Sequence, residues 1–454
     1  MPAVLIAKAQ PSRPPLFSGP LATDNRELLK DYKKAVPEFG AAPEALMQGF
    51  ALMPDVEVHV VSCTRAPMDS PAKLAPNIFF HSLHVPKIGW MRTAYQGCIR
   101  AVWRKLREIR PHIAHGQGTE LDCALNAAFS GFPNVVTIHG NMAELARQFR
   151  ARMGSFGWLA GRLETFTLKR TDGVFCNSAY TEQLVRPRAR RTWRVPNPVR
   201  DHFFAPPPEP TPTRKCVLMN VGLIAVRKRQ LELLDVAREL RQRGLDFEFQ
   251  FVGDACRKTG YVSAFLEKIK PMEREGFARC VGLKTSSELV QLFDRSSGMV
   301  HFSPAESFGL AVAEGLARDL KLFAARVGGV PDITAGVPGA ELFGMDDWQG
   351  LTSAIADWIQ RGFPRARGAS EIMRARYHPE IIARRHVEIY REMMEIVSQK
   401  RLSCWPTLKR VHSAVGNLRC GPRGSSARRR DPARPDSTPE PPLTLPPDEI
   451  PCAA

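Results

Sequence analysis

The sequence predicts an α/β protein built from two doubly wound parallel-sheet domains. Its 454 residues are enough for two domains and a tail. Apolar runs of strand length alternate with stretches of helical periodicity along most of the chain, a pattern typical of parallel sheets covered by helices. Pro196-Asn197-Pro198 and the proline-rich residues 206–212 interrupt this alternation. We therefore expect a linker here, with one domain on either side of it.

The first half of the chain predicts the elements of the first domain. Strands are expected at residues 4–7, 56–62, 113–115, 135–138 and 173–176, and helices at residues 41–52, 92–109, 120–130 and 178–185. Residues 9–40 are rich in proline and then charged, which predicts a long loop with a short helix.

After the linker the same alternation begins again. Strands are expected at residues 217–221, 247–252, 278–281, 298–302 and 322–325, and helices at residues 231–243, 260–272, 286–295 and 308–318. Ligands of doubly wound sheets bind at the C-terminal ends of the strands. Two such sheets joined by a linker therefore predict a ligand cleft between the domains.

The end of the chain predicts a helix and a tail. Residues 378–398 form a long amphipathic pattern, whereas proline, serine and arginine dominate beyond about residue 402. We therefore expect a first domain at residues 1–198, a second at 199–376, a helix at 377–400 and a disordered tail at 401–454.

The composition excludes several protein classes. A 44% hydrophobic and 24% charged chain without a run of about twenty apolar residues predicts no transmembrane helix. The first residues lack the features of a signal peptide and predict a strand. The ten cysteines form no C-x-x-C pair and no cluster with histidine at metal spacing. We therefore expect buried, reduced thiols in a cytoplasmic protein and no metal site.

The formal net charge of +18 suggests an anionic partner. Residues 401–454 hold nine Lys and Arg and five Asp and Glu, so most of the charge lies in the folded part. No nucleic-acid-binding motif accompanies it, and we do not expect a nucleic-acid partner. Residues 88–110 and 145–170 mix arginines with aromatic residues, which is typical of helices on anionic membranes. A core-facing helix with a basic solvent face is the alternative.

Residues 303–332, SPAESFGLAVAEGLARDLKLFAARVGGVPD, carry the strongest functional signal. Glu306 and Glu314 lie eight residues apart around Phe308 and Gly309, where a loop is expected to open into a helix. Amides at a helix start hold phosphate, and carboxylates accept hydrogen bonds from sugar hydroxyls. The pattern indicates a nucleotide-sugar site; an amphipathic helix with solvated glutamates is the structural alternative.

This segment resembles the E-x7-E donor signature of the retaining glycosyltransferases of family 4, which have the GT-B fold of two Rossmann-like domains facing a cleft. The resemblance extends over about residues 1–398. It implies that Glu306 and the residues Ser307, Phe308, Gly309 and Leu310 meet the sugar and diphosphate, while Glu314 binds the ribose. It also implies that the helix at residues 377–400 crosses back to the first domain.

The stretch VGLIAVRKRQLELL resembles a second family element, G-R-L-x-x-x-K-G, with Gly222 at its start and Lys228 on the family's lysine. Leu223 replaces the usual arginine and Arg229 the usual glycine. We expect Arg227 and Lys228 to neutralise the diphosphate leaving group, because both precede a helix at a strand end. Gly253, Val281 and Gly282 resemble the family's backbone contacts to the nucleotide.

Two strand-end loops of the first domain carry histidines. A lone histidine at a strand end is often structural, but the resemblance implies that His139 contacts the transferred sugar or the acceptor. The loop at His115, Gly116 and Gly118 is expected to line the acceptor side. The corner at residues 176–181 and the hinge at residues 195–198 resemble architectural elements of the family.

Together these observations predict a hexosyltransferase that moves a sugar from a nucleoside diphosphate sugar to a hydroxyl of a glycan or lipid-linked acceptor, with retention and without a metal or other cofactor. A cytoplasmic place in cell-envelope polysaccharide synthesis, peripheral on the inner face of the membrane, is expected. Two alternatives stay open. Leu223 suggests a catalytically silent nucleotide- or carbohydrate-binding protein, and a sugar-nucleotide epimerase would need acid and base residues that the sequence does not reveal.

Overall fold

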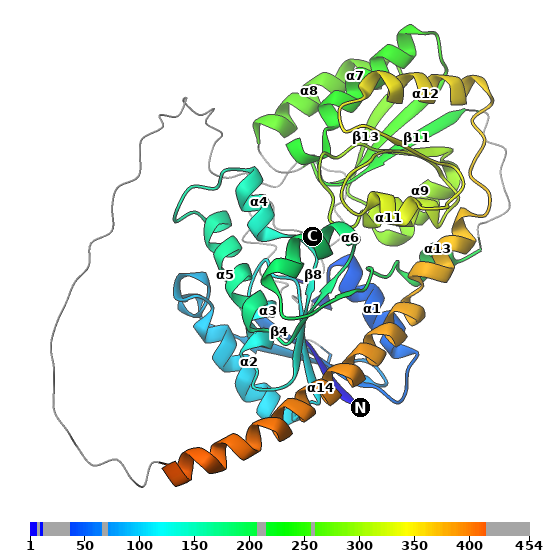
Figure 1. Ribbon diagram of the computed structural model, residues 1–454. Helices are drawn as coiled ribbons and strands as arrows, with labels where there is room; N and C mark the ends of the chain where they lie inside the picture. Colours follow the sequence, from blue (N-terminus) through cyan, green and yellow to red (C-terminus); the bar gives the residue numbers. More distant parts are fainter. Residues whose placement is uncertain (7–9, 12–36, 66–70, 207–214, 256–258, 415–454) are drawn as a thin grey trace.

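Two α/β domains make up the chain in the computed structural model, which describes residues 1–6, 10–11, 37–65, 71–206, 215–255 and 259–414 (Figure 1). Each domain has its own predominantly parallel sheet with helices on both faces. The predicted fold class is therefore confirmed.

The first sheet has eight strands in the order β10-β9-β8-β7-β1-β4-β6-β5, and only β5 runs antiparallel to its neighbour. Its strands are β1 Pro2–Ile6, β4 Glu57–Thr64, β5 Lys73–Ala75, β6 Ile78–His84, β7 Ile113–Gln117, β8 Asn134–Ile138, β9 Gly173–Cys176 and β10 Thr192–Arg194. The helices of this half are α1 Ala41–Ala51, α2 Gln96–Ile109, α3 Cys123–Ala128, α4 Met142–Gln148, α5 Phe156–Arg170 and α6 Ala179–Val185. A separate pair, β2 Gln10–Pro11 and β3 Pro37–Glu38, is antiparallel.

The second sheet has six parallel strands in the order β13-β12-β11-β14-β15-β16. Its strands are β11 Cys216–Val221, β12 Phe247–Val252, β13 Ala278–Gly282, β14 Gly298–His301, β15 Lys321–Ala325 and β16 Ala340–Phe343. Its helices are α7 Gln230–Gln242, α8 Gly260–Arg274, α9 Ser286–Arg295, α10 Leu310–Leu316, α11 Val330–Thr334, α12 Trp348–Gln360 and α13 Ala369–Tyr377. Short 3₁₀ turns lie at Lys87–Gly89, Met91–Thr93, Arg186–Arg188, Asp201–Phe204 and Val226–Lys228.

The strands of the second sheet bury both faces. Leu218 of β11 packs into the core beneath α7, α8 and α12, and its neighbour Met219 packs into the core beneath α9, α10 and α13. This alternation follows from the two-residue period of a strand. It explains why these strands read as continuous apolar runs in the sequence.

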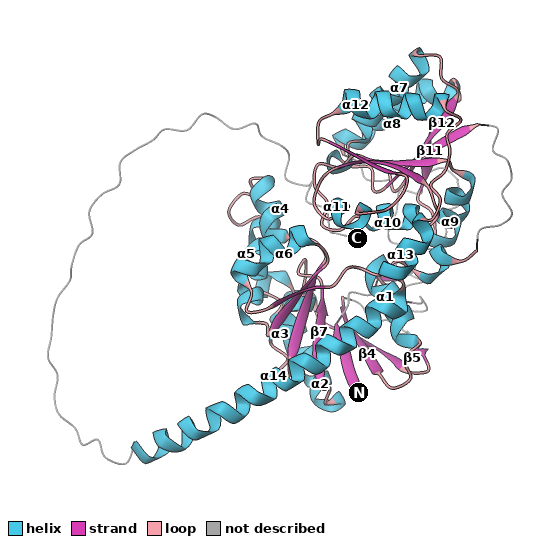
Figure 2. Cartoon of the chain, turned by 45° about the vertical axis from the view of Figure 1, so that its right-hand side comes forward, coloured by secondary structure: helices cyan, strands magenta, loops and turns pink. Residues whose placement is uncertain are grey.

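The last helix, α14 Pro379–Ala414, returns from the second domain to the first (Figures 1 and 2). Its residues Ile382, Val387, Tyr390 and Met393 share one core with α1 and the first sheet. The chain therefore passes between the domains twice, once after β10 and once at the start of α14.

Most predicted elements are present within a few residues of their expected bounds. The helix expected at 92–109 begins only at Gln96, because Ala94 and Tyr95 adopt left-handed backbone conformations that end the preceding turns. The disordered tail predicted from residue 401 is wrong for residues 401–414, where α14 continues. Residues 415–454, and most of the loop predicted at 9–40, lie outside the described residues.

Gly49 tests the docking of α14 on α1. A Cβ atom at Gly49 would lie 2.1 Å from the Pro379 carbonyl oxygen and 2.8 Å from the Ala383 Cβ. We predict that Gly49→Ala lowers the free energy of unfolding by about 1–3 kcal/mol. The added methyl group would clash with the backbone of Pro379, which cannot move aside as a flexible side chain could. Gly260→Ala is the matched control, since a Cβ there meets nothing within 4 Å. Urea unfolding measures both; an unchanged midpoint for Gly49→Ala would contradict the close approach.

Candidate functional site

The signature segment lies at the C-terminal edge of the second sheet. It follows β14 as a loop containing Glu306 and opens into α10 at Leu310, after Gly309 in a left-handed conformation. Glu314 lies inside this helix and is buried. The helix is shorter than the predicted 308–318, but the arrangement of one acid before it and one inside it is the predicted one.

Glu306 is the centre of a buried charged cluster. Its Oε2 lies 2.6 Å from Lys228 Nζ and 3.1 Å from His301 Nε2. The Lys228 and Glu306 side chains are only 13% and 15% exposed. Lys228 ends the 3₁₀ turn after β11, and His301 is the last residue of β14, so neighbouring strands of one sheet bring the three groups together.

The three groups of this cluster change one another's pKa. Burial alone would raise the pKa of Glu306, but Lys228 and His301 keep that pKa well below its usual range. Burial lowers the pKa of Lys228, and Glu306 opposes this change. Burial and the Lys228 charge lower the pKa of His301, so its imidazole is neutral near pH 7. The cluster therefore contains one carboxylate and one ammonium ion.

Two glycines let backbone segments meet at this edge. A Cβ at Gly328 would lie 1.6 Å from the Glu306 carbonyl oxygen, and one at Gly253 would lie 1.9 Å from the Gly222 carbonyl oxygen. The amide of Gly253 also donates to the Gly282 carbonyl at 3.0 Å. The structure thus brings the predicted donor residues Gly222, Gly253 and Gly282 together at the ends of β11, β12 and β13. Val281 packs partly against the core beneath α9.

The structure shows how the two residues that differ from the family element, Arg229 and Leu223, are accommodated. Arg229 adopts the left-handed conformation that glycine prefers, and its guanidinium donates to the Met345 carbonyl and to Asp346, both at 2.9 Å. Leu223 is half-buried, and its carbonyl accepts a hydrogen bond from Gln230 at 3.1 Å. The half-buried Arg227 offers its carbonyl to Ser303 at 2.9 Å.

Glu314 has a partner that sequence reasoning missed. Arg200, from the segment after the hinge, donates to Glu314 Oε1 at 3.0 Å and lies 3.8 Å from Glu44 of α1. Burial raises the pKa of Glu314, and Arg200 opposes this change. A lone arginine after a proline-rich hinge carries no motif, so the sequence offered no signal for this contact.

The two domains touch at the signature loop. Ser178 Oγ donates to the Ser307 carbonyl at 2.6 Å, and the Ala179 amide donates to Asp332 Oδ2 at 2.6 Å. The corner at residues 176–181 therefore contacts the loop that carries Glu306 and Ser307 directly. The Phe308 side chain is buried and packs edge-on against Tyr377, so only the backbone of Phe308 can face a ligand.

His115 does not lie where it was predicted. It is buried beneath α14, with Nδ1 2.5 Å from the Tyr390 hydroxyl and Nε2 2.7 Å from Thr137 Oγ1. Gly116 faces α3, since a Cβ there would lie 2.7 Å from the Cys123 carbonyl oxygen. The structure therefore corrects the assignment of His115 and Gly116 to the acceptor side. Both residues belong to β7 and serve the packing of that strand against α14 and α3.

His139 and Gly118 do lie together. A Cβ at Gly118 would be 3.5 Å from His139 Cδ2 and 2.2 Å from Glu120 Oε2. His139 Nε2 lies 2.9 Å from Gln117 Oε1, and the Gln117 amide nitrogen lies 3.2 Å from His115 Nε2. Burial lowers the pKa of His139 to about 4, which leaves the ring neutral. Gln117 thus connects the buried His115 to His139 by hydrogen bonds.

Glu120, beside His139, is another residue that sequence reasoning missed. It accepts a hydrogen bond from the Gly140 amide at 2.9 Å, and burial raises its pKa to about 7. His139, Gln117, Asn197 and His386 are among the residues that line a small pocket between α1, α14 and the hinge. A carboxyl group with a pKa of about 7 near a histidine is typical of a functional site. Only the fold reveals this property of Glu120, because it depends on burial.

Comparisons with known proteins agree with this architecture. The model of Glycosyltransferase Family 4 matches residues 49–203, and that of Glycosyl transferases group 1 matches residues 215–361. Together the two matches span about two thirds of the chain. Comparison with curated protein sequences found no match.

Several solved structures share the fold. Sucrose-phosphate synthase from Thermosynechococcus elongatus is 16% identical with a TM-score of 0.67, over 87% of this chain and 99% of that one. Anabaena HepE, in a complex with UDP-glucose, is 17% identical with a TM-score of 0.61, over 88% of this chain and all of that one. At this identity the likeness establishes the fold alone. The two family matches show that the chain is a glycosyltransferase that belongs to Glycosyltransferase Family 4 over residues 49–203 and to Glycosyl transferases group 1 over residues 215–361.

Proposed function

We propose that this glycosyltransferase moves a sugar from a nucleoside diphosphate sugar to a hydroxyl acceptor, with retention of the anomeric configuration. The observation that carries the proposal is the buried Lys228–Glu306–His301 cluster in front of α10. It combines a cation for the leaving diphosphate with a carboxylate for the hydroxyls of the sugar.

Lys228 has the capacity to hold the diphosphate without leaving Glu306. An ammonium group has three N–H donors, and the contact with Glu306 uses one of them. The first amides of α10 have no acceptor inside the helix and can receive phosphate oxygens. Arg227 is the nearby cation that would take the place of the family's missing arginine. Because these groups are fixed before the reaction, they need little reorganisation as charge develops on the leaving group.

This donor set suggests chemistry without a metal. Cationic side chains and helix amides would carry the charge that a divalent cation carries in other enzymes. We therefore expect turnover that does not depend on added divalent metal ions. UDP is the first nucleotide to test, because HepE was solved in a complex with UDP-glucose; GDP and ADP stay open.

The acceptor side is proposed at His139, Gly118, Gln117 and Glu120. Gly118 has no side chain to block approach, and the neutral ring and the carboxyl group offer hydrogen-bond partners for a hydroxyl. A glycan or lipid-linked saccharide of the cell envelope is the acceptor class that we propose.

Leu223 favours a second candidate, a catalytically silent protein that binds a nucleotide or carbohydrate. An apolar side chain in place of the family's arginine removes one positive charge from the diphosphate clamp. Release of nucleoside diphosphate from UDP-, GDP- and ADP-sugars separates the two candidates, since only the enzyme produces it.

We predict that Lys228→Ala and Glu306→Ala each reduce nucleoside diphosphate release by at least about a hundredfold, the usual effect of removing one group that stabilises charge in a transition state. Lys270→Ala is the matched control. Lys270 forms a 2.7 Å ion pair with Glu267 on α8, but both side chains are more than half exposed. It should keep full activity. Near-normal turnover in both cluster variants would contradict the site, and a product with inverted configuration by proton NMR would contradict retention.

A cytoplasmic location with peripheral attachment to the inner face of the membrane is part of the proposal. Within the described residues, every helix is too short or too polar to cross a bilayer. Trp90 and Tyr95 are buried in the first domain, so their predicted role as membrane anchors is wrong. The turn between α4 and α5 is a better candidate, because Phe149 and Met153 are 44% and 84% exposed there.

Arg150 and Arg152 alternate with these apolar side chains, which gives the turn the composition of an interfacial anchor. We predict that the protein co-sediments with anionic liposomes at low salt, and that Phe149→Ser with Met153→Ser weakens this at least several-fold. Leu266→Ser, at an exposed apolar residue of α8, is the control and should leave it unchanged. If the wild-type protein stays in the supernatant, the proposed membrane attachment is wrong.

A further inference from the structure

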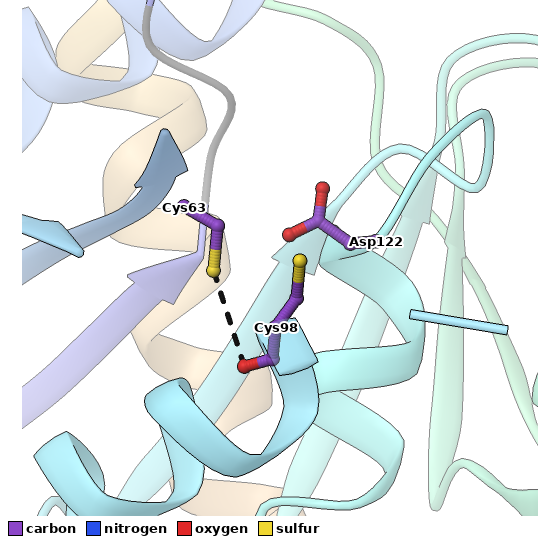
Figure 3. A group of neighbouring side chains, drawn as sticks. All are labelled: Cys63, Cys98 and Asp122. Carbon is purple, nitrogen blue, oxygen red and sulfur yellow. Dashed lines mark hydrogen bonds between the residues drawn. The ribbon is translucent and has the colours of Figure 1, made fainter. Parts of the chain in front are cut away.

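Two thiols and a carboxylate lie close together inside the first domain (Figure 3). Cys63 comes from the end of β4, Cys98 from α2, and Asp122 immediately precedes α3. Their two sulfur atoms and a carboxylate oxygen all lie within 4.8 Å of one another. The three residues are far apart in the sequence, so no spacing pattern reveals the group.

Asp122 is the member that needs a partner. It is 1% exposed, and its Oδ2 accepts a hydrogen bond from Asn126 at 2.9 Å. Its Oδ1 is buried and has no hydrogen-bond partner among the described residues. No lysine or arginine in the described part of the chain forms an ion pair with it. A buried carboxylate oxygen without a donor or cation is unfavourable.

We propose that Cys63, Cys98 and Asp122 bind a zinc ion. Zinc prefers thiolate, imidazole and carboxylate ligands in a tetrahedral arrangement, with Zn–S distances of about 2.3 Å. Tetrahedral sulfur ligands at that distance lie about 3.8 Å apart. Side-chain movements of about 1 Å are therefore enough to close the observed group around the ion.

Charge and protons balance in this step. Zn²⁺ replaces the protons of the two thiols, which pass to solvent, and two Zn–S bonds and one Zn–O bond form. The ion then neutralises two of the three ligand charges. Because zinc binding releases these protons, zinc affinity should fall as the pH is lowered.

Three protein ligands leave one position of a tetrahedron for water or another residue. Cys123, the next residue after Asp122, is buried in the same core as Cys63 and Cys98. The ion would tie together β4, α2 and the start of α3. The segment from β7 to α3 carries Gln117, Gly118 and Glu120, so the metal would also fix the loop beside His139. Its role is structural and separate from the chemistry at Lys228.

The test uses the whole 454-residue chain, stripped with a chelator and then dialysed against Zn²⁺ or Co²⁺. We expect one zinc per chain by mass spectrometry of the metal, and a thiolate-to-cobalt charge-transfer band in the near ultraviolet. Cys98→Ser and Asp122→Asn should each reduce the bound zinc at least tenfold, and the cobalt band should weaken in Cys98→Ser. Cys216→Ser, at a buried thiol of β11, is the control and should bind one zinc.

Zinc should also raise the thermal midpoint of the wild type and of Cys216→Ser but not of Asp122→Asn, which keeps both thiols and the volume of the side chain. Folding of Asp122→Asn is checked by its circular dichroism, so loss of metal is not confused with loss of structure. Failure of the wild type to bind zinc, full binding by Cys98→Ser and Asp122→Asn, or a Cys63–Cys98 disulfide in place of the metal would each overturn the proposal. None of these outcomes depends on glycosyl transfer.

Discussion

The ion pair between Lys228 and Glu306 is the constraint around which the second domain is arranged. Two opposite charges with side chains about one-seventh exposed must stay together, because separating them would leave a desolvated charge without a partner. The pair connects the turn after β11 to the loop after β14. His301, at the end of β14, contacts the same carboxylate oxygen of Glu306. The close approach of Gly328 to the backbone of Glu306 fixes the same loop from the other side. These contacts set the geometry of the Lys228–Glu306–His301 cluster.

The second level of organisation joins the domains. Arg200 links Glu314 of α10 to the neighbourhood of α1, and the α6 corner bonds to the Ser307 carbonyl and to Asp332. On the first domain, Tyr390 of α14 bonds to His115, which supports Gln117 and, through it, His139. Helix α14 belongs to the core of the first domain but follows the second in the chain. Its packing therefore influences the side of the cleft that we assign to the acceptor.

Sequence reasoning reached the elements with strong local patterns. The strands at 173–176 and 247–252 and the helix at 286–295 have the predicted bounds, because apolar runs and caps mark them locally. The E-x7-E spacing located Glu306 and Glu314, and the strand-to-helix turn located Lys228. Strand β6 and strand β16 were missed, since only the first three residues of β6 form an apolar run and β16 is only half-buried.

The failures at the site have one physical cause. The sequence lists polar residues, but only the fold decides which of them meet. His115 reads like a cleft residue yet is buried under α14, while Glu120, two residues beyond Gly118, carries the raised pKa. Arg200 and the Cys63–Cys98–Asp122 group depend on contacts between segments distant in the chain. No local motif records such contacts.

Nucleotide-dependent stabilisation is the sharpest test of whether Lys228, held in place by Glu306, binds the diphosphate. Thermal unfolding is measured with UDP, GDP and ADP, with uridine as the ligand that lacks the diphosphate. We expect one nucleoside diphosphate to stabilise the wild type by about 2.7 kcal/mol at a hundred times its Kd and uridine to do much less. Lys228→Ala should lose the effect, while Lys270→Ala should keep it. No stabilisation by any of the three nucleotides, or equal stabilisation of Lys228→Ala, would contradict this expectation.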